Sequence, residues 1–257
     1  MPSMKEIYSG HAAQYDELVS HEDYEDNLKS FLRGRLDFEG KTVVEFGAGT
    51  GRLTGSYIDQ ASSAFCLDQS RHMLEVARQN LRLFRHKLQF LEHDNVDGFE
   101  PIPRADIAME GWAFGHTVID HCHRIPEITE LLVANCLGAI RETGIVVIIE
   151  TMGTGVESAA APRAELRQFY EVLETRHGFE RTIVPTDYRF DDVDSASRIM
   201  GFFFGDEMGR RVKERGSAVV SEYTGVWLRD GDTTAPLRSP RGWRRGPPVN
   251  RKNWSDG

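Results

Sequence analysis

Between residues 42 and 53 the chain reads Thr42-Val43-Val44-Glu45-Phe46-Gly47-Ala48-Gly49-Thr50-Gly51-Arg52-Leu53. A short β-branched run is followed by three glycines at alternate positions, and a helical pattern begins after the third. Glycines at this spacing allow a tight turn after a buried strand and let backbone N–H groups approach a ligand closely. Because a helix starts at the turn, its first amides point at an anion bound there. The stretch predicts a strand–turn–helix unit that binds a nucleotide-type ligand.

The glycine spacing and the residues that follow narrow the kind of ligand. The pattern is G-x-G-x-G rather than the G-x-G-x-x-G of dinucleotide enzymes, and the lysine of a G-x-x-x-x-G-K-[ST] phosphate loop is absent. A second apolar run at residues 63–67 is followed by Asp68, and an acid about 20 residues after such a turn can bind both hydroxyls of a ribose. Together these features predict a nucleoside site.

These stretches resemble two motifs of the class I S-adenosylmethionine-dependent methyltransferases. VVEFGAGTG (residues 43–51) is similar to the family's first motif, and CLDQSRHMLEVA (residues 66–77) is similar to its second, acid-bearing motif. The order of such signals agrees from about Tyr8 to Leu228, which is nearly the whole chain. The resemblance implies an enzyme that takes a methyl group from S-adenosylmethionine and releases S-adenosylhomocysteine.

Apolar segments of two kinds alternate along the chain. Strand-like runs occupy residues 42–46, 63–67, 88–92, 106–109, 145–150 and 180–187, and helical patterns occupy 52–59, 70–84, 125–141 and 162–176. This alternation predicts an α/β fold whose parallel sheet is covered by helices on both faces. The resemblance extends this to a doubly wound, seven-stranded, mostly parallel, Rossmann-like sheet in which residues 219–228 form an antiparallel last strand.

We expect residues 1–228 to form a single methyltransferase domain with two additions. Two helical patterns in residues 1–38 predict an N-terminal cap. Residues 190–216 predict a helical insertion before the last strand, and its run Phe202-Phe203-Phe204 either packs as core or belongs to a lid over the pocket. Residues 229–257 hold seven basic residues against three acidic ones and almost no aliphatic residues, so we expect a basic, disordered tail.

Composition bounds the partners and the compartment. The net charge of −9 over 257 residues argues against a nucleic-acid partner, since neutralising phosphates needs clustered Lys and Arg. The three cysteines are scattered and give neither a disulfide framework nor a C-x-x-C metal spacing. The first residues lack a signal-peptide core and no run approaches a membrane span, so we expect a cytoplasmic protein without a membrane partner. The oligomeric state is left open.

The resemblance assigns roles in the expected cofactor site. Glu45 would bind the methionine amino group, directly or through water, and the glycine amides would lie near the methionine carboxylate. Asp68 would bind the ribose, Met73 would face the adenine, and Asp94 would accept from the adenine amine while the next amide donates to the ring. The full expected cofactor set is Glu45, Gly47, Ala48, Gly49, Gly51, Asp68, Gln69, Met73, Asp94, Asn95, Glu110 and Gly111.

These residues also have plain structural alternatives. The glycines could form a generic strand–helix turn, and Asp68 could cap the following helix, although Ser70 fits that cap better. Met73, at helical spacing, could be a core residue. Asp94-Asn95 could be a surface turn of the kind found in any loop.

Residues 105–112 form the predicted fourth strand and its exit, the position that faces the transferred methyl group in the family. The segment ends in Glu110-Gly111-Trp112. It carries neither the Asn/Asp-Pro-Pro-aromatic motif of nucleic-acid amino methyltransferases nor the paired glutamates of protein arginine methyltransferases. Trp112 either contacts a ligand in this cleft or closes the core beneath the loop.

Three histidines follow this strand, at positions 116, 121 and 123. They lack fixed carboxylate partners, so we predict no metal site. A histidine near neutral pKa can take a proton from a hydroxyl, thiol or amine, and we select His116, near the strand end, as the candidate general base. Tyr15 is the second catalytic candidate, because Tyr15-Asp16 resembles the N-terminal helix that closes over the cofactor in many small-molecule methyltransferases. The alternative for Tyr15 is helix packing.

We therefore predict methyl transfer to a small-molecule acceptor through an O, N, S or C nucleophile. Displacement at a sulfonium needs alignment, exclusion of water and, for some acceptors, removal of a proton, which explains why no nucleophile motif is legible. Three alternatives stay open. They are a methyltransferase of a macromolecule, which the basic tail would favour, a non-methylating S-adenosylmethionine-binding protein on the same fold, and a nicotinamide oxidoreductase on a related fold.

Overall fold

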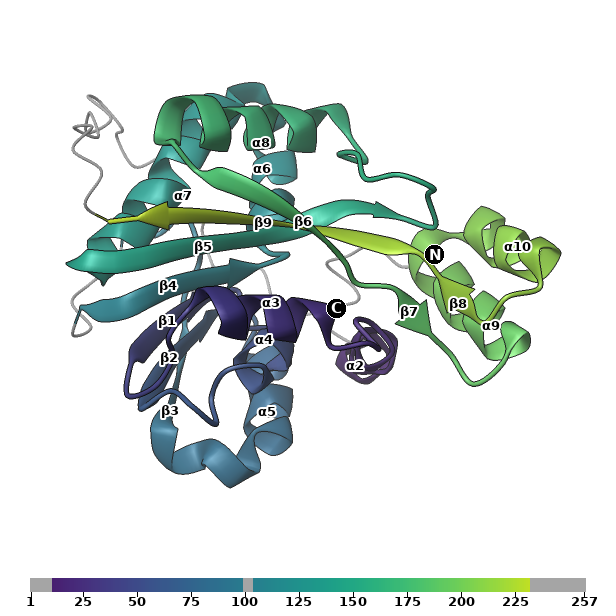
Figure 1. Cartoon of the computed structure of the whole chain (residues 1–257), viewed down its shortest axis with the longest axis horizontal. Coiled ribbons are helices and arrows are strands. Elements are labelled where there is room, and N and C mark those ends of the chain that lie inside the picture. The colour runs from purple at the N-terminus through teal and green to yellow at the C-terminus, as the bar shows by residue number, and fades with distance from the viewer. Residues whose placement is uncertain (1–10, 99–103, 232–257) are drawn as a thin grey trace, which may run out of the picture.

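The computed structural model describes residues 11–98 and 104–231, and its centre is a seven-stranded sheet (Figure 1). The strands lie in the order β3-β2-β1-β4-β5-β9-β6. Neighbouring strands from β3 to β5 run parallel, and β9 runs antiparallel to both β5 and β6. The bounds are β1 Thr42–Phe46, β2 Ser63–Asp68, β3 Leu88–Glu92, β4 Ala105–Gly111, β5 Ile140–Thr154, β6 Glu180–Pro185 and β9 Glu222–Asp230. The expected doubly wound, mostly parallel, Rossmann-like sheet with an antiparallel last strand is confirmed.

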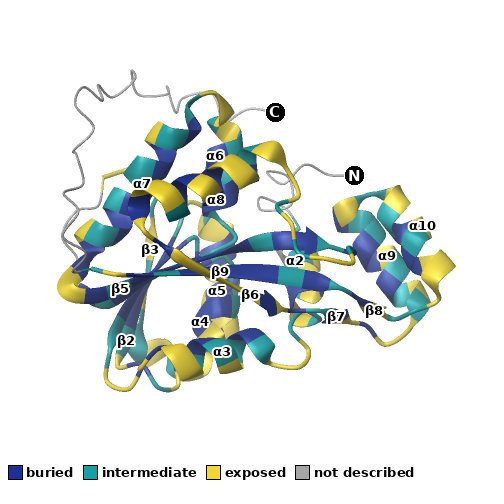
Figure 2. Ribbon diagram, turned by 45° about the horizontal axis from the view of Figure 1, so that its top comes forward, coloured by how far each residue is buried: buried dark blue, intermediate teal, exposed yellow. Residues whose placement is uncertain are grey.

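Helices cover both faces of this sheet (Figure 1). One face carries α3 (Asn27–Arg35), α4 (Arg52–Gly55) and α5 (Arg71–Asn80), and the other carries α6 (Phe114–Asp120), α7 (Ile125–Ala139) and α8 (Ala164–His177). Side chains of β1 alternate between the two faces, so that Val43 packs in one apolar cluster while Val44 and Phe46 pack in the other. The central strands are accordingly buried along most of their length (Figure 2). This double burial explains why these strands read as continuous apolar runs.

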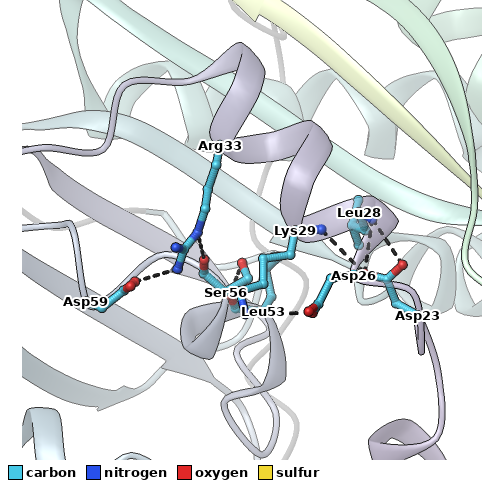
Figure 3. Close-up of polar contacts among 8 residues, drawn as sticks. All are labelled: Asp23, Asp26, Leu28, Lys29, Arg33, Leu53, Ser56 and Asp59. Carbon is cyan, nitrogen blue, oxygen red and sulfur yellow. Dashed lines mark hydrogen bonds and ion pairs between the residues drawn. The ribbon is translucent and has the colours of Figure 1, made fainter.

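Polar contacts tie α3 to the segment that follows α4 (Figure 3). The Asp23 carboxylate accepts from the Leu28 amide at 3.0 Å and from the Lys29 amide at 3.4 Å, which satisfies the first amides of α3. Arg33, at the other end of this helix, donates to the Ser56 carbonyl at 2.9 Å and to the Asp59 carboxylate at 2.6 Å. The helix α3 is thus fixed against the segment that follows α4.

Of the two expected N-terminal helices, α3 packs on the sheet, whereas α2 forms a separate small core with the insertion. α2 (Ala12–Ser20) packs against β7 (Tyr188–Arg189), α9 (Val193–Phe204), α10 (Asp206–Arg215) and β8 (Val219–Val220). Its buried apolar residues include Leu18, Tyr188, Phe190, Ile199, Met200, Phe203 and Val212. An ion pair between Arg198 and Glu17, at 3.1 Å, also joins α9 to α2. The insertion projects from one end of the sheet (Figure 1).

Several element bounds differ from the sequence-based expectation. α4 ends at Gly55, although the helix was expected to continue to residue 59. β5 begins at Ile140, directly after α7, although that helix was expected to reach residue 141 and the strand to begin at 145. β9 continues to Asp230, so residues 229 and 230 belong to the sheet rather than to the expected tail. The rest of that tail (232–257) and Tyr8 lie outside the described residues. The helix α6 was not expected at all, because seven residues give too short a pattern to recognise.

Candidate active site

A cavity of about 150 Å³ lies at the carboxyl ends of the parallel strands, where ligands bind in doubly wound folds. It brings together eight expected cofactor residues (Gly47, Gly49, Asp68, Gln69, Met73, Asp94, Asn95 and Gly111) and both catalytic candidates (Tyr15 and His116). The remaining lining residues are Ser70, Val96, Trp112, Ala113, Thr117, Asp120 and His121. Four expected cofactor residues do not line it: Glu45, Ala48, Gly51 and Glu110. Segments between residues 15 and 121 thus converge on one site.

The turn after β1 needs glycine for two separate reasons. Gly47 has a φ of +66°, in the left-handed region, and a Cβ placed on it would lie 2.1 Å from the Ala113 Cβ. Gly51 has a φ of +86°, and a Cβ there would lie 2.6 Å from a methyl carbon of Leu81. Ala48 holds the turn by donating its amide to the Leu67 carbonyl at 2.8 Å. Ala48 and Gly51 therefore shape the turn from behind, while Gly47 and Gly49 face the cavity.

Asp68 connects this turn to the start of α5. One carboxylate oxygen accepts from the Gly49 amide at 2.9 Å and the other accepts from the Ser70 amide at 2.7 Å. The α5 cap is Ser70, whose hydroxyl accepts from the Met73 amide at 3.3 Å, as the sequence favoured. Burial raises the pKa of Asp68, and the two amide contacts partly offset that rise. Each carboxylate oxygen keeps a second lone pair for a ligand hydroxyl.

The loop after β3 is held against α7. Asp94 accepts from the Val96 amide at 3.1 Å, which makes the turn that the sequence offered as an alternative. The Asn135 side chain of α7, which is buried, donates to the carbonyls of Asn95 at 2.9 Å and Asp97 at 3.0 Å. Asp94 and Asn95 line the cavity in this arrangement, so the turn and the expected adenine contacts are compatible. The sequence carried no signal for Asn135.

Glu45, which was expected to contact the methionine amino group directly or through water, does not line the cavity. Its side chain is buried and accepts from the Thr54 hydroxyl at 2.8 Å and from the Tyr57 hydroxyl at 2.6 Å. Burial raises the pKa of Glu45 to about 7, and these two hydroxyl donors limit the rise. Glu45 therefore anchors α4 beneath the turn. Its contact with a cofactor amino group stays a prediction.

Glu110 also points into the protein, where it forms a pair with Glu150 of β5. Glu110 accepts from the amides of Ala113 at 2.7 Å and Phe114 at 3.0 Å, and Glu150 accepts from the next amide, that of Gly115. Two buried carboxylates thus hold the first turn of α6, the helix that carries His116. Burial raises the pKa of Glu110 to about 7 and raises that of Glu150 well above its ordinary value, with the Glu110 charge adding to the second shift.

This pair predicts a stability that depends on pH. A carboxyl group with a raised pKa binds its proton more tightly in the folded chain, so its contribution is full below about pH 4.5 and is lost as the pH rises toward about 7. We expect Glu150→Gln to flatten the fall in unfolding free energy between pH 5 and pH 8, because the neutral amide still accepts from Gly115 without adding a charge. Urea unfolding across that range measures it, with the exposed Glu142→Gln on the same strand as control. Parallel profiles for wild type and Glu150→Gln would show that Glu150 does not contribute to this pH dependence.

His116 of α6 and Tyr15 of α2 both line the cavity. Burial lowers the pKa of His116, and Asp120 one turn later partly offsets that shift, so the imidazole is neutral near pH 7. Burial raises the pKa of Tyr15 to about 12, so its phenol keeps its proton. No residue between 190 and 216 lines the cavity, and Phe203 is buried with Leu18 instead. This favours the core alternative for the aromatic run over the lid.

Fold and site together define the class of protein. The protein has a seven-stranded sheet in which the last strand of the chain, β9, lies antiparallel between β5 and β6. It also has a glycine turn after β1 and an acid at the end of β2. These are the features of a class I S-adenosylmethionine-dependent methyltransferase. The chain belongs to the O-methyltransferase domain family, whose model matches residues 27–189.

Two curated relatives are named as methyltransferases, and solved structures share the fold. An uncharacterized methyltransferase of Anoxybacillus flavithermus is 24% identical over 207 residues, which cover 70% of this chain and 91% of that protein. The methyltransferase YrrT of Bacillus subtilis is 28% identical over 115 residues, covering 43% of this chain and 53% of that protein. The fold is similar to that of YcgJ from Bacillus subtilis (TM-score 0.52, 11% identity, 80% of this chain and 97% of that one). It is also similar to that of the [4+2]-cyclase SpnF (TM-score 0.52, 15% identity, 79% of this chain and 80% of that one).

Within residues 11–98 and 104–231, no helix has the length and apolar character that crossing a membrane requires.

Proposed function

We propose that this methyltransferase transfers the methyl group of S-adenosylmethionine to a hydroxyl oxygen of a small molecule, with His116 as the general base. The observation that carries the proposal is that His116 lines the same cavity as the glycine turn, Asp68 and Asp94. The match to an O-methyltransferase domain supports oxygen as the acceptor atom. The net charge of −9 supports a small molecule over a nucleic acid.

The residues around the cavity fit the cofactor. Gly47 and Gly49 line the cavity and carry no side chain, so the backbone of the turn can come close to the methionine end of the cofactor. Asp68 would take the ribose hydroxyls, and Met73, Asp94 and Asn95 would border the adenine. Gln69 and Gly111 complete the walls on either side. The other expected residues would support the site without lining it. Ala48 and Gly51 would shape the turn, Glu45 would anchor α4, and Glu110 would hold the first turn of α6.

Three tasks fall to the chain in this mechanism. S-adenosylmethionine supplies an activated methyl group whose leaving group is a neutral thioether. The cavity residues align the acceptor oxygen behind that group and exclude water. His116 takes the hydroxyl proton on a ring nitrogen as the oxygen attacks, and its lowered pKa keeps it neutral and able to accept near pH 7. Tyr15 closes the cavity from α2 and, as a neutral phenol, can donate to the bound ligands.

The acceptor atom is tested with methyl-labelled S-adenosylmethionine and a panel of small phenols, aliphatic alcohols, thiols and amines. We expect label on hydroxyl compounds. Label found only on amines or thiols would overturn the choice of oxygen. Cofactor binding without any labelled product would instead favour a protein that binds S-adenosylmethionine without transferring its methyl group. Label that appears only on macromolecules, and disappears when residues 232–257 are deleted, would favour a macromolecular acceptor.

The role of His116 is tested by His116→Gln. We expect turnover to fall about a hundredfold, while the dissociation constant for S-adenosylhomocysteine changes by no more than about threefold, because a general base contributes to the chemical step rather than to cofactor binding. In the wild type, turnover should fall at low pH, since an imidazolium cannot accept the proton, and the inflection should lie below the ordinary histidine value of 6.5. His72→Gln, on the exposed side of α5, is the control. Full turnover in His116→Gln would remove His116 from the mechanism.

A further inference from the structure

Trp112, directly after β4, has a backbone conformation that is rare for a bulky residue. Its φ is +56°, in the left-handed region. Among the residues that the structure describes, the other non-glycine residues with positive φ are Asp23 and Asp26, and aspartate tolerates this region better than tryptophan does. Strained conformations of this kind persist only where surrounding contacts enforce them, and they cluster at functional sites.

Two sets of contacts enforce this conformation. The Trp112 amide donates to the Ile149 carbonyl of β5 at 2.8 Å, which fixes the backbone. The Arg52 guanidinium lies over the indole, 3.9 Å from the ring centroid, in a cation–π arrangement. Arg52 is itself held by both carboxylate oxygens of Glu22, at 2.7 and 2.8 Å. The Glu22 side chain is only 3% exposed, so this bidentate pair is shielded from solvent and gives the guanidinium a defined orientation.

The indole lies between two cavities. Trp112 lines the cofactor cavity together with Asp68 and His116. It also lines a second cavity of about 220 Å³, together with Glu22 and Arg52. Figure 3 shows side chains around that second cavity, among them Asp23, Asp26, Leu28, Leu53 and Ser56. Trp112 is therefore a shared wall of both cavities, and Arg52, which lies over its ring, lines the second cavity and not the first.

We propose that Trp112 contacts the bound sulfonium nucleoside as a wall of the cofactor cavity, and that Glu22 and Arg52 are positioning residues that hold its indole in place. The inference rests on the proposed function, since it takes this cavity as the cofactor site. It takes the ligand-contact alternative for Trp112 and adds roles for Glu22 and Arg52, which were not among the expected cofactor residues. The indole would exclude water from the methionine end of the cofactor, and loss of the Arg52 stack would let it leave that position.

The test for contact uses tryptophan fluorescence during titration with S-adenosylhomocysteine, with calorimetry as an independent measure of binding. We expect the wild type and Trp227→Phe to show a fluorescence change on binding. Trp227 is the matched control because it is buried in the core on the α7–α8 face of the sheet. Trp112→Phe should still bind by calorimetry but should lose the fluorescence change. A change that persists in Trp112→Phe would overturn the contact.

The test for positioning compares two arginines that each lie over a tryptophan. Arg52→Gln with Glu22→Gln removes the stack without leaving a buried unpaired charge, and we expect it to weaken S-adenosylhomocysteine binding about tenfold. Arg181→Gln removes the corresponding contact over Trp227, where the guanidinium lies 5.7 Å from the ring, and should change binding by less than about twofold. Equal affinities in the double variant and the wild type would overturn the positioning role. A wild-type protein that is folded but does not bind S-adenosylhomocysteine would instead overturn the proposed function.

Discussion

Replacing Gly47 with alanine is expected to abolish S-adenosylhomocysteine binding and to destabilise the fold. The residue has a φ of +66°, and the left-handed region costs an L-residue about 1–2 kcal/mol. The new methyl would also lie 2.1 Å from the Ala113 Cβ, and because that atom is attached directly to the backbone, the segment between β4 and α6 must move. That segment carries Trp112 and leads into the helix of His116, so one added methyl should disturb both the proposed cofactor cradle and the proposed base.

Gly40→Ala separates the two causes. Gly40 has nearly the same φ, +68°, but a Cβ there would meet nothing within 4 Å. Its alanine variant should lose about 1 kcal/mol in urea unfolding and bind S-adenosylhomocysteine like the wild type. Calorimetry on the two variants measures the difference directly. If Gly47→Ala binds as tightly as Gly40→Ala, the turn after β1 is not the cofactor cradle.

The second large effect is expected at Asp68. Asp68→Ala should weaken S-adenosylhomocysteine binding about a thousandfold, because two charge-assisted hydrogen bonds to a ribose would be lost and the amides of Gly49 and Ser70 would lose their acceptor. Asp68→Asn should show an intermediate loss, since the amide keeps one acceptor oxygen but no charge. Calorimetry again gives the dissociation constants.

Asp106→Ala is the matched control for the loss of a backbone partner. Asp106 also accepts from a strand amide, that of Thr42 at 2.8 Å, and it pairs with Arg141. It lies near the start of β4, at the amino ends of the parallel strands and away from the cavity. Its variant should lose stability without losing affinity. An Asp68→Ala protein that binds S-adenosylhomocysteine as well as Asp106→Ala does would rule out Asp68 as the ribose-binding residue.

The parts of the site that the sequence predicted depend on local geometry. Residues 42–53 specify a buried strand, a glycine turn and a helix start within twelve neighbouring positions, and the end of the next strand then places Asp68 beside that turn. Neighbouring parallel strands have their carboxyl ends on the same side of the sheet. Gly49, Asp68 and Asp94 follow the ends of β1, β2 and β3, so they come together when a doubly wound sheet forms. Ser70 could likewise be recognised as a cap because its partner, Met73, is three residues away.

Tertiary structure decided the rest of the site, because packing selects which side chains are buried against one another. α6 forms in place of the expected loop because carboxylates of Glu110 and Glu150 satisfy its first amides, and Glu150 is 35 residues from Gly115. Glu45 faces Thr54 and Tyr57 because the β1 pleat directs it under α4 rather than into the cavity. Trp112 stands between two cavities because Glu22, 30 residues before Arg52, aligns the guanidinium above it. A sequence shows which side chains a protein has, but packing decides which of them are buried against one another. That burial determines their contacts and shifts their pKa values.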